Sequence, residues 1–266
     1  MKRPCLTTTA LLAFALGAVV SPASAQDPTP AQVEIAYPLI QAGERLVAAI
    51  TAAEQQGARL PTVGESPALI RSAFDVDRLE RLAGSPVGLI MVSCDKGRTA
   101  KMSYFVGGTS RDEAESSDPT LRARAIRAAA ENYSRYQDEG ALAMRFELRC
   151  LGLLTPGFEA YLASPEGVED RAQTGPMQEG HAGALDTAII LASSPVASDS
   201  NADLLSAEIL RQTPVLARTI TARQRQRLIA RIDTLNLEGQ PPERKIRFQA
   251  IRQALVESGC GPICGG

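Results

Sequence analysis

The chain has 266 residues, a formal net charge of -2, no tryptophan and one histidine. A single histidine excludes metal sites built from several imidazoles. Nucleic acid is not an expected partner, because the chain is net acidic and Phe248 is the only aromatic residue in its basic segment. We expect no cofactor, since no glycine-rich phosphate loop follows a predicted strand.

Residues 1–25 have the composition of a cleavable export signal. Residues 1–3 include two cations, residues 10–20 are continuously apolar, and residues 23–25 are small. The apolar run is about half of the roughly 20 residues that a spanning helix needs, so we expect cleavage before Gln26 and no transmembrane anchor. The mature protein is then expected in the periplasm or outside the cell, where cysteines tend to pair.

Helix starts are marked by a capping residue directly before a proline, the combination preferred at the N-cap and first position of a helix. These pairs are Ser66-Pro67, Ser85-Pro86, Asp118-Pro119 and Ser164-Pro165. Thr221 with Gln224 three residues later predicts a capping box. Pro242, followed by Glu243, predicts one more start.

Apolar residues recur at helical spacing between these starts. The first mature helix has a stripe that Pro38 should limit at its N-terminal end, and a long helical pattern over residues 121–151 should bend or break at Gly140. The stripes are Ala36, Ile40, Gly43, Val47 and Ile50; Leu228, Ile232 and Leu235; and Phe248, Ile251 and Leu255. We predict a mainly α-helical protein in which residues 26–266 form one domain, a bundle of about six to eight helices stapled by disulfides.

Residues 87–106 fit two structures. Asp95 to Arg98 could form the turn of a short β-hairpin, because apolar and polar residues alternate after it. We favour a helix, since two strands alone are marginally stable and the neighbouring segments are helical. Residues 165–202 are rich in glycine and proline, and we expect a flexible segment there with only a short buried helix at residues 184–192.

Four cysteines follow the export signal, namely Cys94, Cys150, Cys260 and Cys264. Four cysteines allow three disulfide connectivities. We favour Cys94 with Cys150, which would stabilise the fold by about 4 kcal/mol in the chain-entropy model, and Cys260 with Cys264, which closes a very small ring.

Cys260-Gly-Pro-Ile-Cys264 resembles the Cys-Gly-Pro-Cys motif of thioredoxin-like oxidoreductases over five residues, with one residue inserted. Such a motif needs a helix N-terminus to lower the pKa of its first thiol, whereas here a helical pattern ends before the cysteine. A redox role is therefore a third hypothesis.

Catalytic candidates are few. A nucleophilic triad would need His181, with Glu179 or Asp186 to orient it, but the glycine-rich context predicts an exposed histidine in a loop. A hydrolytic carboxylate pair could come from Asp75 with Asp77 or Glu166 with Glu169, although both pairs are typical of helix starts and surfaces. An acidic cluster could bind Ca²⁺ weakly but lacks the spacing of an EF-hand loop; it comprises Asp112, Glu113, Glu115 and Asp118.

The segment from Arg211 to Arg252 has ten basic and three acidic residues in a chain that is otherwise acidic. Most such charges pair within a protein, but this asymmetry can also mark a face for an anionic envelope component or an acidic protein surface. The predicted partner-binding residues are Arg218, Arg223, Arg225, Arg227 and Arg231. We expect an exported non-enzymatic binding or scaffold protein of the cell envelope. The alternative is an envelope hydrolase acting on peptidoglycan or a peptide through a carboxylate pair or His181.

Overall fold

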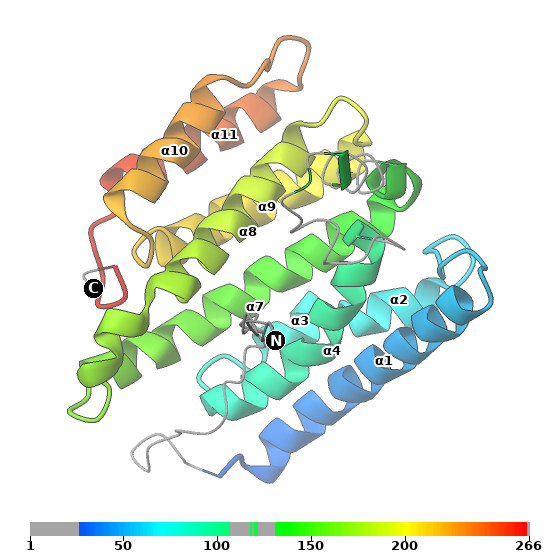
Figure 1. Ribbon diagram of the computed structural model, residues 1–266, viewed down its shortest axis with the longest axis horizontal. Coiled ribbons are helices and arrows are strands. Elements are labelled where there is room, and N and C mark those ends of the chain that lie inside the picture. Colours follow the sequence, from blue (N-terminus) through cyan, green and yellow to red (C-terminus); the bar gives the residue numbers. More distant parts are fainter. Residues whose placement is uncertain (1–26, 107–117, 119, 122–130, 265–266) are drawn as a thin grey trace, which may run out of the picture.

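The computed structural model describes residues 27–106, 118, 120–121 and 131–264 (Figure 1). Within these ranges the chain forms nine α-helices, one 3-10 helix and no strand. The predicted helical bundle is confirmed, with more helices than expected because two short ones, α2 (Pro67–Ala73) and α3 (Val76–Glu80), follow the first long helix. The predicted export signal lies outside the described residues.

Residues 87–106 form one continuous helix, α4 (Val87–Val106), so the hairpin alternative is wrong for this segment. The reason is visible in which side chains are buried. The residues at positions 90, 94, 97, 100 and 104 are buried, and these spacings of three and four residues are those of one helical face. A strand would have placed Met102 on the same side as Ala100 and Tyr104, but Met102 is 49% exposed.

The long helices lie side by side in a row (Figure 1). The row runs α1 (Pro30–Gln55), α4, α7 (Gln137–Ala163), α9 (Asp199–Leu216) and α11 (Pro242–Glu257). A second set of helices covers it: α2 and α3 pack on α1, α8 (Gly175–Ser193) packs on α7 and α9, and α10 (Ala222–Asp233) packs on α8 and α11. The C-terminal half therefore depends on α7 and α9 for its position.

The buried apolar residues form two clusters that meet on α7. Phe146 and Cys150 of α7 belong to the cluster with α1 to α4, whereas Met144 and Leu148 belong to the cluster with α8 to α11. A helix that is apolar on two opposite sides is typical of a protein interior. The central helix is thus shared by both halves of the core.

Several helix starts agree with the capping signals. Thr221 and Gln224 form the capping box at the start of α10, and α11 begins at Pro242. Ser66 is the N-cap of α2, and α4 begins one residue after Pro86. These residues act locally, so their signal does not depend on the rest of the fold.

Three expectations about helix ends are wrong. Ser164 is the C-cap of α7 and begins a turn, because its carbonyl accepts from the amide of Gly167. Pro38 lies inside α1, which starts earlier at a capping box made by Thr29 and its partner three residues later. The long helical pattern breaks at Tyr136, which has φ −121° and ψ 38°, and Gly140 lies within α7. Pro119 lies outside the described residues.

The glycine-rich segment is more helical than expected. Residues 169–173 form a 3-10 helix (η1, Glu169–Gln173), and α8 extends over 19 residues in place of a short helix at 184–192. Each glycine in a helix costs about 1 kcal/mol relative to alanine. Burial of residues such as Leu185 and Ile189, which are 1% and 0% exposed, offsets that cost.

The predicted pairing of Cys94 with Cys150 is confirmed, and it joins α4 to α7 with a Cα–Cα distance of 6.0 Å. One helical turn away, Gly97 lets the two helices approach closely. A Cβ atom at position 97 would lie 2.4 Å from a ring carbon of Phe146, which is itself 1% exposed and cannot move freely. The α4–α7 contact therefore requires a glycine as well as a disulfide.

We predict that Gly97→Ala destabilises the protein by about 1 to 3 kcal/mol, because the added methyl group overpacks a filled contact. Gly88→Ala is the matched control in the same helix, since a Cβ there meets nothing within 4 Å. The control should stabilise the protein by up to about 1 kcal/mol through helix propensity. Urea unfolding followed by circular dichroism measures both changes, and equal effects of the two variants would contradict this packing.

We predict that Cys94→Ala with Cys150→Ala lowers the free energy of unfolding by about 4 kcal/mol, because the disulfide closes a long loop in the unfolded chain. Cys260→Ala with Cys264→Ala should cost only about half as much, since its loop is much shorter. Urea unfolding of both double variants under non-reducing conditions tests this order, and a larger loss for the second variant would refute it.

Candidate functional site

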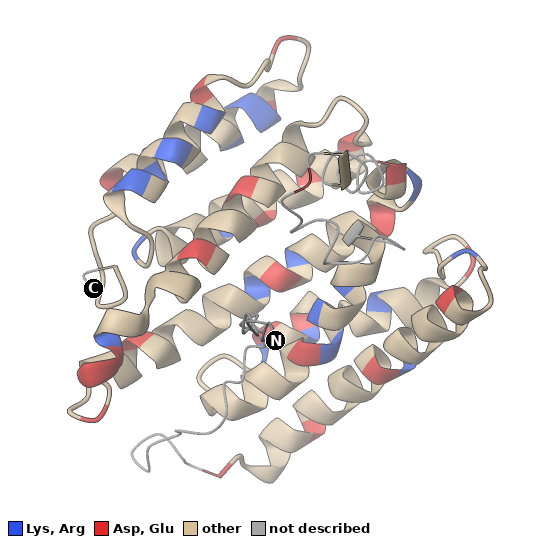
Figure 2. Ribbon diagram, in the orientation of Figure 1, with Lys and Arg blue, Asp and Glu red and all other residues tan. Residues whose placement is uncertain are grey.

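Four of the five predicted partner-binding arginines lie on α10, which faces acidic residues of α8 (Figure 2). Arg227 pairs with Glu179 at 3.6 Å, and Arg231 pairs with Asp186 at 3.0 Å. Arg223 is exposed on α10 and has no ion pair among the residues that the structure describes. Two of the five candidate arginines, Arg227 and Arg231, therefore line the space between α8 and α10, and a third, Arg223, is exposed on α10.

A hollow of about 410 Å³ lies between α8 and α10. Both ion pairs line the hollow. Gln224 also lines it and donates from Nε2 to Glu179 at 2.7 Å. Leu228, which is 2% exposed, lies at its base. The remaining lining residues are Ala182, Gly183 and Ala230. The hollow is thus lined by small side chains and by charged groups of both signs.

The other two candidate arginines hold the fold together. Arg218 forms an ion pair with Glu159 at the end of α7. Arg225 donates from Nη1 to the carbonyl oxygens of Ala217 at 3.1 Å and Ile220 at 2.7 Å. These carbonyls follow the end of α9, where backbone acceptors have no helical partner. Arg225 therefore fastens the turn between α9 and α10, which the sequence could not distinguish from partner binding.

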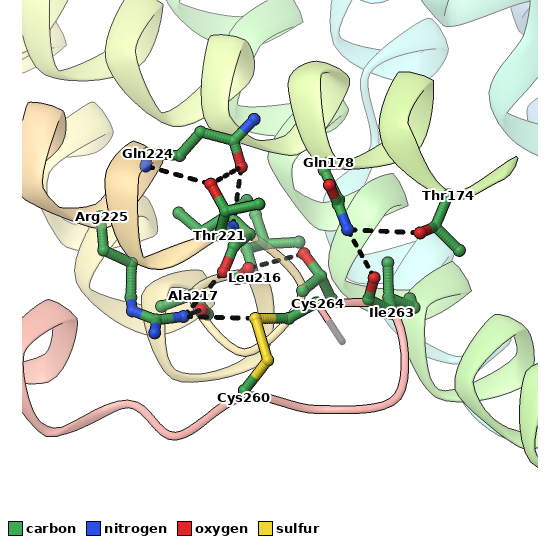
Figure 3. The surroundings of a disulfide bond; sticks show 12 residues. Thr174, Gln178, Leu216, Ala217, Thr221, Gln224, Arg225, Cys260, Ile263 and Cys264 are labelled. Atoms are coloured by element: carbon green, nitrogen blue, oxygen red, sulfur yellow. Dashed lines mark hydrogen bonds between the residues drawn. A yellow bond between two sulfur atoms is a disulfide. The ribbon is translucent and has the colours of Figure 1, made fainter. Parts of the chain in front are cut away.

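The C-terminal ring, Cys260–Cys264, has the predicted disulfide, with a Cα–Cα distance of 5.4 Å (Figure 3). It lies against the turn that Arg225 fastens. Gln178 of α8 donates from Nε2 to the carbonyl of Ile263 at 2.6 Å, and the amide of Gly261 donates to the carbonyl of Arg218 at 2.8 Å. The ring is therefore docked on α8 and on the α9–α10 turn, beside the hollow.

His181 is buried in α8 and is 3% exposed, so the expectation of an exposed loop histidine is wrong. Its Nδ1 lies 2.6 Å from the hydroxyl oxygen of Thr219, which gives its own proton to the carbonyl of Leu216 at 2.7 Å. A hydroxyl has one proton, so the Nδ1–H of His181 must donate to the threonine oxygen. Burial, with a smaller contribution from the charge of Arg98, lowers the pKa of His181 to about 4.

The acids expected to orient His181 point elsewhere, because Glu179 and Asp186 bind arginines of α10. Within the part of the chain that the structure describes, no hydrogen bond joins His181 to an acidic side chain. Its partner is a threonine whose proton is engaged with the backbone. His181 therefore acts here as a packed helix residue that anchors the end of α9.

The candidate carboxylate pairs have structural roles. Asp75 is the N-cap of α3 and accepts from the amide of Arg78 at 2.9 Å, while Asp77 is exposed in the same first turn. Glu166 and Glu169 are exposed where the chain turns from α7 into η1. None of the four lines the hollow.

The acidic cluster considered for weak Ca²⁺ binding lies mostly outside the described residues, since Asp112, Glu113 and Glu115 are not among them. Asp118 is described, and its Oδ1 accepts from the amide of Thr120 at 2.8 Å. Over residues 27–106, 118, 120–121 and 131–264, no three histidine, cysteine or acidic side chains gather in a group that could hold a metal ion.

A buried polar cluster that sequence reasoning missed lies at the start of α7. Glu139 is 3% exposed and accepts a hydrogen bond from the amide of Val63, and Tyr104 donates to the carbonyl of Pro61 at 2.8 Å. Desolvation raises the pKa of both groups. The cluster holds residues 60–63 against α7. Its members are distant in sequence, so no local pattern indicates it.

No family model matches the chain, and no curated protein or solved structure matches it either. None of the helices in the described ranges combines the length and the hydropathy needed to cross a membrane. The fold and site define an all-α, disulfide-bonded protein with a charged hollow between α8 and α10.

We predict that acid weakens the wild type more than His181→Gln. The pKa of His181 is lowered from 6.5 to about 4 on folding, so the unfolded chain takes up a proton first as the pH falls. The wild type should lose up to about 3 kcal/mol relative to the variant between pH 6.5 and 4, at about 1.4 kcal/mol per pKa unit. Urea unfolding across this range measures the difference, and a difference independent of pH would contradict a buried neutral imidazole.

Proposed function

We propose that this is an exported, non-enzymatic binding protein of the cell envelope, and that its contact surface is the face of α10 that borders the α8–α10 hollow. The observation that carries the proposal is Arg227, an exposed arginine that lines a hollow whose other wall is α8, together with the exposed Arg223 four residues before it on α10. Arg231 extends the same wall inward.

The ion pairs at this rim are of the kind that a ligand can replace. The side chains of Arg227 and Glu179 are 62% and 68% exposed and 3.6 Å apart. Pairs this exposed contribute little to stability, about 0 to 1 kcal/mol, because water screens them. An anionic group can therefore take the place of Glu179 at little cost, while the backbone of α10 keeps the arginine in position.

The partner that fits this surface is anionic. A phosphate or carboxylate matches the planar fork of an arginine with two hydrogen bonds. Arg223 and Arg227 are four residues apart and so project from the same side of α10. An anionic envelope component, such as a lipid head group, or an acidic protein surface presents several such groups together.

The ion pairs formed by the two acids in the hollow favour binding over hydrolysis as its role. The two acids that line the hollow, Glu179 and Asp186, are each neutralised by an arginine and partly exposed. A hydrolytic carboxylate pair needs both acids free to face the substrate, whereas each of these acids is bound to an arginine. The envelope-hydrolase alternative thus gains no support from this hollow.

We predict that Arg223→Glu with Arg227→Glu weakens binding to an anionic partner by at least about tenfold, because it reverses two charges at the contact. The probes are vesicles containing phosphatidylglycerol and, separately, an acidic polypeptide, with phosphatidylcholine vesicles as the neutral reference. Cosedimentation or interferometry at 50 and 200 mM salt measures the affinity, which should fall as salt rises.

The matched control is Arg45→Glu with Arg71→Glu, which changes the net charge equally on exposed residues of α1 and α2. It should bind like the wild type. Equal losses of affinity in both double variants would show that only the net charge matters. If the wild type bound neither anionic probe, the proposed surface would be overturned.

A further inference from the structure

The two disulfides differ in what can reach them. Cys94 and Cys150 are both 0% exposed, so an external thiol has no approach to either sulfur while the protein is folded. In the C-terminal ring, Cys260 is exposed, whereas Cys264 is only 8% exposed. Thiol–disulfide exchange requires access to one sulfur and depends on which sulfur is attacked. The ring offers that access at Cys260 alone.

The buried end of the ring is anchored by contacts that do not involve sulfur. Ile263 is 0% exposed, and its carbonyl accepts from Gln178 at 2.6 Å. On the other side, the amide of Gly261 donates to the carbonyl of Arg218 at 2.8 Å. These contacts remain when the sulfur–sulfur bond opens, so Cys264 keeps its position.

A cation stands beside the buried sulfur. Nη1 of Arg225 lies 3.8 Å from Sγ of Cys264 (Figure 3). The same nitrogen is held by the carbonyls of Ala217 and Ile220, so the guanidinium is fixed there by the α9–α10 turn. A fixed positive charge stabilises a thiolate more than a thiol. In this respect Arg225 does what a helix N-terminus does for other reactive cysteines.

We propose that the Cys260–Cys264 ring is a site of thiol–disulfide exchange with a dithiol, in which Cys260 is the attacked sulfur and Cys264, next to Arg225, is the leaving sulfur. The inference is independent of the anion-binding surface, since it uses neither Arg223 nor Arg227.

The exchange balances with the dithiol as reductant. One thiolate of the dithiol attacks Sγ of Cys260, a new sulfur–sulfur bond forms there, and the electron pair of the ring disulfide leaves on Cys264 as a thiolate. The second thiolate of the same dithiol then attacks the dithiol sulfur that is bonded to Cys260, and Cys260 leaves as a thiolate. The ring gains two electrons and the dithiol becomes a disulfide; each cysteine thiolate takes a proton according to its pKa.

The first test is selective reduction of the folded protein. The wild type is treated with dithiothreitol without denaturant, quenched with an alkylating reagent at intervals, and mapped by peptide mass spectrometry. Cys260 and Cys264 should be alkylated while Cys94 and Cys150 stay paired. Reduction of both disulfides at the same rate, or of the buried one first, would overturn the proposal.

The second test isolates Arg225. Arg225→Gln should slow reduction of the ring about threefold for each pKa unit by which the leaving thiol rises. Arg225→Lys should restore part of the rate, and Arg45→Gln, which alters an exposed arginine of α1, should leave the rate unchanged. A folded Arg225→Gln protein that is reduced at the wild-type rate would remove Arg225 from the exchange.

A third measurement does not depend on whether Arg225→Gln folds. In Cys260→Ser the thiol of Cys264 is free beside the intact arginine. The ultraviolet absorbance of its thiolate, followed against pH, reports its pKa without requiring a reagent to reach the buried sulfur. That pKa should lie below the ordinary value of about 8.5. A value at or above it would mean that burial outweighs the cation and that Cys264 is a poor leaving sulfur.

Discussion

Arg149 places a positive charge inside the protein, and the arrangement of the central helices follows from satisfying it. Its guanidinium donates two hydrogen bonds to Glu208 of α9, at 2.8 and 2.7 Å, and a third to Glu80 of α3. The side chains of Arg149 and Glu208 are only 4% and 3% exposed. Leaving such a charge unpaired would cost several kcal/mol, so α3, α7 and α9 must keep these positions together. Desolvation acts to lower the pKa of Arg149, but the two carboxylates outweigh it and the pKa is raised.

The same helix carries both apolar clusters, which makes α7 the element that joins the two halves of the row. Close packing extends this joint to α9, because a Cβ atom at Gly152 would lie 2.0 Å from Oε1 of Gln212. Gln212 in turn donates to Glu208 at 2.7 Å. The position of α9 is thus set both by the ion pair of Glu208 with Arg149 and by the close packing of Gln212 at Gly152. Helices α8 and α11 pack on α9, and α10 packs on α8 and α11, so the position of α9 also sets that of the charged hollow and of the C-terminal ring.

Sequence reasoning succeeded where a signal is local. The capping box at Thr221 and the start at Pro242 each depend on a few neighbouring residues. The disulfide pairs were predictable from the even number of cysteines after residue 25. It failed at Ser164-Pro165, because a capping residue before proline suits a turn after a helix as well as a helix start. The site was only partly predictable. Which arginines bind the backbone, as Arg225 does, and which remain available, as Arg223 does, depends on the partners that the fold brings to them. His181 had a usable signal, because Ala182, Leu185 and Ile189 recur near it at helical spacing, but its glycine-rich setting indicated a loop.

If α7 and the Arg149 pair join the two halves, the halves should open together. Native-state hydrogen exchange with mass spectrometry, followed over increasing urea, measures the opening free energy of each segment. Peptides from α4 and from α11, which lie in different apolar clusters and on opposite sides of α7, should converge on one value and one urea dependence. A protected α4 alongside an α11 that opens at a lower free energy and with a smaller urea dependence would show two independent units, and would contradict the account.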